Sequence, residues 1–166
     1  SDVYKRQSQN IRPSSHSLDL QPMENASQAP VILITGGSRG VGAATARLAA
    51  AQGYDVVISY LSDESAADTV IADVRAAGRQ GLAVRADSAD PAQVARLFAE
   101  LDRTFGRLDV LVNNAAILQR QCRLEDLDFE RMHRIFAVNA IGPILCAQQA
   151  ITVSYTHLTL PTICSV

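Results

Sequence analysis

The stretch VILITGGSRGVG, residues 31–42, contains the pattern that decides the fold. Four apolar residues in succession, Val31 to Ile34, are typical of a strand buried on both faces of a parallel sheet. The glycines that follow predict a turn, and from Val41 to Ala49 apolar residues recur at helical spacing. The stretch therefore predicts a buried strand, a glycine-rich turn and a helix, in that order.

The middle of the chain continues this alternation. Apolar segments at 55–60, 81–86 and 108–113 predict three more strands, separated by segments with helical spacing, and a long helix is expected over about 129–150. Strands and helices that alternate with short connections predict an α/β fold, a Rossmann-type doubly wound parallel sheet. We expect this sheet to be truncated after about four strands and the long helix, which would leave 108–113 as an uncovered edge.

The spacing of Thr35, Gly36, Gly40 and Gly42, written TGxxxGxG, predicts an anion-binding corner. A strand that leads into a helix directs free N–H groups and the positive end of the helix dipole at one point. Gly36 permits a tight turn, Gly40 lets the backbone approach a pyrophosphate, and Gly42 lets the helix pack closely against the strand. The GK[ST] of a P-loop is missing, which disfavours ATP hydrolysis. The alternative is a glycine turn that binds no ligand.

The end of the second predicted strand bears on the choice of dinucleotide. An acidic residue there would bind the ribose 2′-hydroxyl of NAD, but the strand ends with residues 59–62, SYLS, and Asp63 comes late. Arg39, inside the glycine turn, could instead pair with a 2′-phosphate. We therefore expect NADP(H) to be favoured over NAD(H). The alternative for Arg39 is a solvated loop charge.

These features together resemble the short-chain dehydrogenase/reductase family over about residues 30–151. The segment 35–42 is similar to the family's cofactor loop, and residues 113–116, NNAA, resemble its NNAG motif with Ala116 in place of glycine. Asp87 follows the third predicted strand, where the family has a residue that bonds the adenine amino group. Asn139 lies about where the family places the Asn of its catalytic tetrad.

The resemblance implies an NAD(P)-dependent oxidoreductase that transfers a hydride between the nicotinamide and a carbonyl or alcohol substrate. It implies Asn139 as a catalytic residue. The expected cofactor-binding residues are Thr35, Gly36, Ser38, Arg39, Gly40, Val41, Gly42, Tyr60, Asp87, Ser88, Asn113 and Ala115. Three of the residues that the resemblance assigns have a structural alternative. Asp87 could be a helix cap, Asn113 could be a turn residue, and the side chain of Asn139 could bond to a neighbouring carbonyl.

The family's catalytic Ser and its Tyr-x-x-x-Lys are not identifiable, because Tyr155 is followed by Thr159. We therefore expect the chain by itself to be inactive. Two other functions remain open: a non-catalytic dinucleotide-binding regulatory protein, and a short binding module that ends where this chain ends.

Both ends of the chain resemble translated adapter DNA. Residues 1–7, SDVYKRQ, can be translated back into a DNA sequence. The reverse complement of that DNA, read in another frame, encodes the end of Thr152 and then residues 153–158. We interpret 1–7 and 152–166 as adapter-like artefacts, and 8–29 as a disordered or normally untranslated segment with Met23 as the natural start. Residues 30–151 are then an incomplete NADP-binding domain. The alternative for the C-terminal end is a β-strand over 153–160.

Composition disfavours several other functions. Lys plus Arg is 15 against 17 for Asp plus Glu, a net charge of −2, which is unusual for a nucleic-acid-binding protein. No apolar run approaches the ~20 residues of a membrane span. Isolated His and Cys residues without CxxC predict no metal and favour a cytoplasmic location. Four arginines that lie close together in the sequence are typical of a solvated face, and the alternative is a site for a substrate anion: Arg120, Arg123, Arg131 and Arg134. The expected partners are a small-molecule substrate and, by the resemblance, copies of the same chain in a dimer or tetramer.

Overall fold

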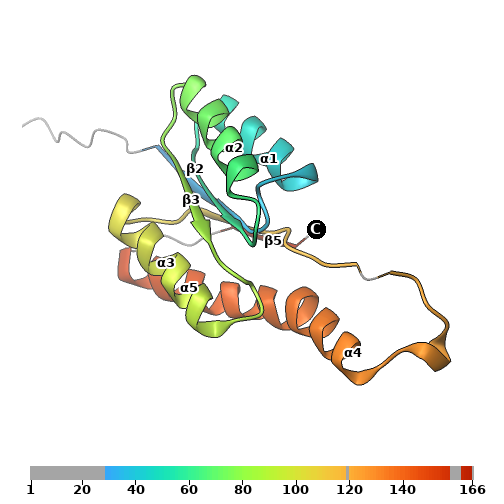
Figure 1. The fold of residues 1–166 in the computed structure, drawn as a ribbon. Coiled ribbons are helices and arrows are strands. Elements are labelled where there is room, and N and C mark those ends of the chain that lie inside the picture. Colours follow the sequence, from blue (N-terminus) through green and yellow to red (C-terminus); the bar gives the residue numbers. More distant parts are fainter. Residues whose placement is uncertain (1–28, 119, 158–161, 166) are drawn as a thin grey trace, which may run out of the picture.

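The computed structural model describes residues 29–118, 120–157 and 162–165. One parallel sheet forms the centre of the molecule, with helices on both faces (Figure 1). The strand order is β3-β2-β1-β4-β5, and every neighbouring pair is parallel. The strands are β1 Val31–Ile34, β2 Asp55–Tyr60, β3 Gly81–Arg85, β4 Val110–Asn113 and β5 Thr162–Ser165. The predicted α/β doubly wound architecture is confirmed.

Two helices cover each face of the sheet. On one face lie α1 (Gly40–Ala51) and α2 (Glu64–Ala76), and on the other lie α3 (Pro91–Phe105) and α5 (Gly142–His157) (Figure 1). A short 3-10 turn, η1 (Leu124–Asp126), precedes α4 (Phe129–Phe136), and a π-helical segment, η2 (Ala137–Ile141), joins α4 to α5.

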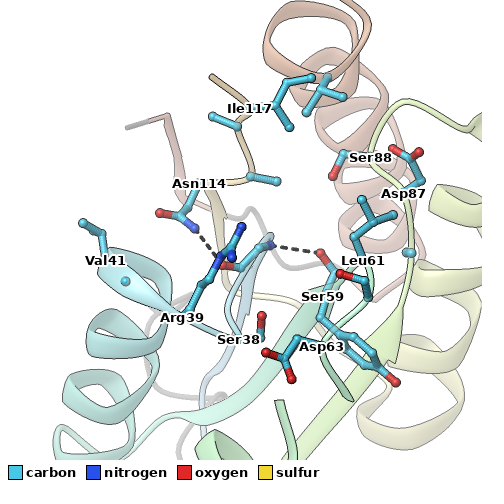
Figure 2. A pocket seen from close by; sticks show the side chains of 18 of the residues that line it. Ser38, Arg39, Val41, Ser59, Leu61, Asp63, Asp87, Ser88, Asn114 and Ile117 are labelled. Carbon is cyan, nitrogen blue, oxygen red and sulfur yellow. Dashed lines mark hydrogen bonds between the residues drawn. The ribbon is translucent and has the colours of Figure 1, made fainter. Parts of the chain in front are cut away.

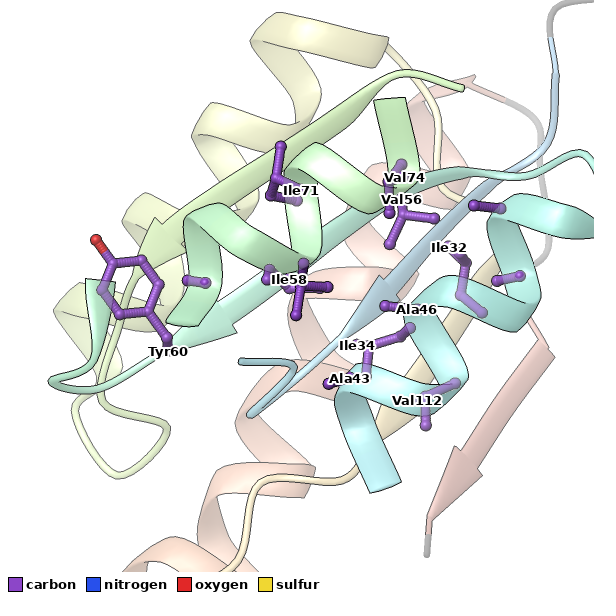
Figure 3. Packing of buried hydrophobic residues seen from close by; sticks show 14 residues of the cluster. Ile32, Ile34, Ala43, Ala46, Val56, Ile58, Tyr60, Ile71, Val74 and Val112 are labelled. Atoms are coloured by element: carbon purple, nitrogen blue, oxygen red, sulfur yellow. The ribbon is translucent and has the colours of Figure 1, made fainter. Parts of the chain in front are cut away.

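The core has two parts, one on each side of the sheet. Ile32 and Ile34 of β1 pack in the cluster under α1 and α2 (Figure 3), whereas Val31 and Leu33 pack in the cluster under α3 and α5. Side chains alternate between the two faces of a strand, so a strand covered on both faces needs apolar residues at every position. This is the physical reason for the uninterrupted apolar run of β1, all of which is buried.

The four predicted parallel strands are confirmed, and a short fifth strand follows the long helix, which corrects the expectation of an uncovered edge at 108–113. Strand β5 lies parallel to β4, with Val110 opposite Thr162 and Asn113 opposite Ser165, so β4 is not the edge. A bare β4 would expose a row of unpaired N–H and C=O groups, and pairing with β5 satisfies them. The alternative of a strand over 153–160 is wrong for residues 153–157, because they belong to α5, which ends at His157. The expectations for residues 1–28 lie outside the described residues.

The long helix predicted over 129–150 is interrupted by a π-helical segment. Pro143 has no N–H to donate to the carbonyl four residues earlier, at Asn139, which favours a local change in the hydrogen-bond ladder. Gly142 permits a close contact at the same place: a Cβ there would lie 2.8 Å from the carbonyl oxygen of Ser88. This helix therefore packs tightly against the segment that follows β3.

The helical stretch Phe129–Val153 is long and apolar enough, by length and composition only, to cross a membrane. This stretch is not a continuous apolar run, because Asn139, Gln148 and Gln149 interrupt a segment that carries no charge from Ile135 to Val153. One such helix is weak evidence, since core helices pass the same test. In this structure Cys146 and Ala150 of α5 are buried in the core beside α3.

Candidate functional site

A pocket of about 370 Å³ opens at the carboxyl ends of β1, β2, β3 and β4 (Figure 2). After β1 the chain passes to one face of the sheet, and after β4 it passes to the other face. A crevice at such a switch point is where open α/β sheets bind ligands. The lining residues come from the glycine turn, from the ends of β2 and β3, from the loop after β4 and from the α4–η2 helix.

The glycine turn has a backbone that only glycines permit. Gly36 and Gly40 have φ values of +66° and +57°, in the left-handed region that side chains disfavour. At Gly42, a Cβ would lie 2.5 Å from Asn114 Nδ2 and 2.6 Å from the carbonyl oxygen of Gly36. The absence of a side chain at Gly42 therefore allows α1 to start directly behind the turn.

The N-terminus of α1 is open toward the pocket. Asp63, Asp90 and Asp128 cap α2, α3 and α4 by accepting hydrogen bonds from backbone N–H groups. At α1 the N-cap residue is Arg39, which makes no capping hydrogen bond, and the first turn contains no acidic residue. Gly40 and Val41 line the pocket. The uncapped N–H groups and the positive end of the α1 dipole therefore suit an anionic ligand such as a pyrophosphate.

A hydrogen-bonded junction between β1 and β4 supports the turn. The Oγ1 of Thr35 accepts hydrogen bonds from the backbone N–H groups of Asn114 and Ala115, both at 3.0 Å. In return, the Nδ2 of Asn114 donates to the carbonyl oxygens of Thr35 (2.8 Å) and Gly36 (3.0 Å). The predicted site omits Asn114, although its place as the second Asn of the NNAA motif was a usable signal. Asn113 is buried and donates to the carbonyl oxygen of Pro143 at 3.4 Å.

The end of β2 forms the wall beside Arg39. Asp63 lines the pocket, but its carboxylate is engaged at the start of α2, where it accepts from Ala66 N at 3.0 Å. Ser59 Oγ accepts from Gly36 N at 3.1 Å and so ties β2 to the glycine turn. Burial, together with the negative charges of Glu64 and Asp68, raises the pKa of Tyr60, and its hydroxyl stays protonated at neutral pH.

Asp87 lies at the opposite wall, after β3. Its carboxylate accepts hydrogen bonds from Ala89 N at 2.9 Å and from the guanidinium of Arg134 at 2.8 Å. The alternative that Asp87 caps the next helix is wrong, because Asp90 caps α3. The assignment of Arg134 to a solvated face is also wrong, since Arg134 lines the pocket and pairs with Asp87.

Asn139 lies on the π-helical segment η2. Its Oδ1 accepts from Ile117 N at 2.9 Å, and its Nδ2 donates to the Ile117 carbonyl oxygen at 3.0 Å. The side chain therefore joins η2 to the loop after β4, as in the alternative of a bond to a neighbouring carbonyl. Ile117 and Val138 line the pocket, and Asn139 does not.

The structure brings most of the predicted cofactor residues to one pocket. Those that line it are Gly36, Ser38, Arg39, Gly40, Val41, Tyr60, Asp87, Ser88 and Ala115. Thr35, Gly42 and Asn113 lie behind the wall and support it. Within the part of the chain that the structure describes, no group of three or more His, Cys, Asp or Glu residues could hold a metal ion. Burial raises the pKa of the Cys146 thiol to about 11, which leaves it protonated at neutral pH.

Comparisons with known proteins agree with this geometry. Residues 30–155 match the family model described as short chain dehydrogenase. The chain is 40% identical over 121 residues to "Uncharacterized oxidoreductase YgfF" of Escherichia coli (strain K12), covering 73% of this chain and 49% of that protein. It is also 40% identical over 120 residues to "3-oxoacyl-[acyl-carrier-protein] reductase" of Synechocystis sp., covering 72% of this chain and 48% of that protein.

Solved structures agree as well. A short chain dehydrogenase from Burkholderia cenocepacia J2315, in complex with NADP, superposes with a TM-score of 0.72 at 42% identity, covering 75% of this chain and 51% of that chain. The present chain spans about half the length of the curated relatives it matches.

Proposed function

Because the chain belongs to the short-chain dehydrogenase family, a family of oxidoreductases, we propose that the whole protein is an NAD(P)-dependent enzyme that interconverts a carbonyl and an alcohol. The observation that carries this proposal is the uncapped start of α1, joined to β1 by a glycine turn at the mouth of the pocket. The nicotinamide, when bound, supplies or accepts the hydride. The residues of this chain bind the dinucleotide and orient it.

The glycine turn and the first turn of α1 would hold the pyrophosphate. Their backbone N–H groups are the donors, and the left-handed Gly40 leaves them accessible, since no heavy atom lies within 4 Å of where its Cβ would be. Thr35 and Asn114 hold this backbone from behind through their hydrogen bonds. The site therefore needs no rearrangement of the turn to accept an anion, which favours binding.

We propose that NADP(H) is preferred over NAD(H). Arg39 is exposed at the pocket, and among the described residues it has no ion-pair partner, so its guanidinium is available to a 2′-phosphate (Figure 2). The acidic residue that lines the pocket on the β2 side, Asp63, already caps α2. The complex of the Burkholderia relative with NADP supports the same choice.

Substituting Arg39 by alanine is expected to weaken NADPH binding about tenfold and to leave NADH binding unchanged, because only NADPH carries the 2′-phosphate. Isothermal titration calorimetry with both dinucleotides measures the two affinities. Arg39→Lys keeps the charge without the planar fork and is expected to lose only part of the preference. An NADPH preference that survives in Arg39→Ala would contradict this role.

We propose that Asn139 serves catalysis in the whole protein by holding the loop at Ile117 against η2, which fixes two parts of the pocket wall. The Ser and the Tyr-x-x-x-Lys of the family pattern have no counterpart that we can identify in this chain. We therefore propose that the chain alone binds the dinucleotide without oxidising or reducing a substrate.

We also propose that the whole protein is a homo-oligomer. Phe129, Phe136, Ile144 and Ile151 are 69%, 65%, 59% and 44% exposed. Successive members are seven residues apart, except that eight residues separate Phe136 from Ile144, and η2 lies between these two. Because a π-helical segment accommodates one extra residue, all four side chains stay on one stripe along the helix. A stripe of this kind can pair with the same stripe of a second copy. Light scattering of the whole protein is expected to show a dimer or tetramer, and a monomer would contradict the proposal.

A further inference from the structure

An ion pair crosses the pocket wall between two distant parts of the chain. Arg134 lies on α4 and Asp87 lies directly after β3, and their side chains meet with Nη2 and Oδ2 at 2.8 Å. The two side chains are 37% and 20% exposed, so the pair is partly shielded from water. Both residues line the pocket, and Figure 2 shows the Asp87 carboxylate at its rim beside Ser88.

The orientation of the Asp87 carboxylate is fixed from several sides. One oxygen accepts from Ala89 N at 2.9 Å, and the other accepts from Arg134. The backbone N–H of Asp87 donates to Oε1 of Gln93 at 3.0 Å. Gly142 packs so closely on Ser88 that the segment after β3 is held against the helix. Each carboxylate oxygen still has a lone pair with which to accept one more hydrogen bond.

The pocket surface next to this carboxylate suits a flat heterocycle. Leu61, Ala86 and Val138 provide apolar contacts, and Asp87 provides the acceptor. Adenine has an exocyclic amino group that donates to a carboxylate. Hypoxanthine has a carbonyl oxygen at the same position, which a carboxylate repels.

We propose that Arg134 is a positioning residue that holds the Asp87 carboxylate as an acceptor for the adenine amino group, and that this pair makes the pocket select adenine over hypoxanthine. The inference rests on the proposed function, because it needs a dinucleotide in the pocket. Without Arg134, the carboxylate has one anchoring bond fewer and can turn toward solvent.

The test compares NADPH with its hypoxanthine analogue, reduced nicotinamide hypoxanthine dinucleotide phosphate. Calorimetric titration of the full 166-residue chain is expected to show an affinity about tenfold higher for NADPH. Arg134→Ala and Asp87→Asn are each expected to reduce this preference to about twofold, and the double variant to reduce it no further. Arg134→Lys is expected to keep a preference for NADPH of about threefold, which is half of the original preference on a logarithmic scale. Arg47→Ala removes a comparable ion pair, Arg47–Asp73 at 2.7 Å, outside the pocket, and is expected to change nothing.

Each other outcome has a distinct meaning. If Arg134→Ala weakens both nucleotides equally and the preference persists, Arg134 is only structural and the inference is overturned. If the unaltered chain binds both analogues equally, the inference fails while the proposed function stands. If it binds neither, the proposed function fails and the inference fails with it. If circular dichroism shows Arg134→Ala to be unfolded, Arg134→Gln takes its place, with the same loss of preference expected and the same reversal if the preference persists.

Discussion

The Gly42→Ala variant is expected to bind NADPH at least about a hundredfold more weakly than the unaltered chain, and to lose about 2 kcal/mol in its free energy of unfolding. The added Cβ would lie 2.5 Å from Asn114 Nδ2, 2.6 Å from the Gly36 carbonyl oxygen and 3.0 Å from Gly37 Cα. Two of these atoms belong to the backbone of the turn, so relief of the clash must move the turn itself. The N–H groups that would hold the phosphates move with it.

Calorimetry with NADPH and urea unfolding measure the two effects of Gly42→Ala. Gly53→Ala is the matched control, because Gly53 follows the other end of α1 and has a φ of +93° with open space around it. The control is expected to cost about 1 kcal/mol of stability through backbone strain and to leave NADPH affinity unchanged. If Gly42→Ala bound NADPH as the control does, the close approach at Gly42 would have no part in binding.

The Thr35→Val variant is expected to lower the free energy of unfolding by about 2 kcal/mol, although valine has nearly the same shape as threonine. Thr35 is 2% exposed, and its hydroxyl oxygen accepts from the N–H groups of Asn114 and Ala115. Valine would leave the N–H of Ala115 without an acceptor, whereas the N–H of Asn114 keeps its bond to the Val112 carbonyl oxygen at 3.1 Å. An unsatisfied donor costs about 1–3 kcal/mol. Because Ala115 lines the pocket, the affinity for NADPH is expected to fall as well.

Thr35→Ser separates the hydroxyl from the methyl group. Serine keeps the oxygen acceptor and loses one buried methyl, which costs about 1 kcal/mol. Urea unfolding is expected to give the valine variant a lower free energy of unfolding than the serine variant. The reverse order would mean that packing of the methyl group, and not the hydrogen-bonded junction, holds β1 to β4.

Local patterns were sufficient to predict strands β1 to β4 and the glycine turn. The uninterrupted run Val31–Ile34 indicates burial on both faces, and the structure buries it on both faces. The spacing of Gly36, Gly40 and Gly42 predicted a turn before a helix, and α1 begins at Gly40. The residues that determine these features are close together in the sequence, within one strand and the helix that follows it. The spacing of apolar residues predicts structure over such short segments.

Contacts between distant segments could not be predicted in the same way. Arg134 and Asp87 are 47 residues apart, and nothing in the run of arginines distinguishes Arg134 from its neighbours before the helix is packed. The bonds of Asn114 to the backbone of the glycine turn span 78 and 79 residues. The pairing of β5 with β4 likewise depends on which strand edge remains open once the sheet has formed.

Amide NMR spectra of the isotope-labelled chain, recorded during titration with NADPH, test the central claim most directly. If the corner between β1 and α1 holds the pyrophosphate, the amide signals of Gly36, Gly40 and Val41 are expected to shift first and most, with smaller shifts at Asp87 and Ser88. A folded chain in which these amides keep their positions at saturating NADPH, or in which the shifts gather elsewhere on the molecule, would contradict the assignment.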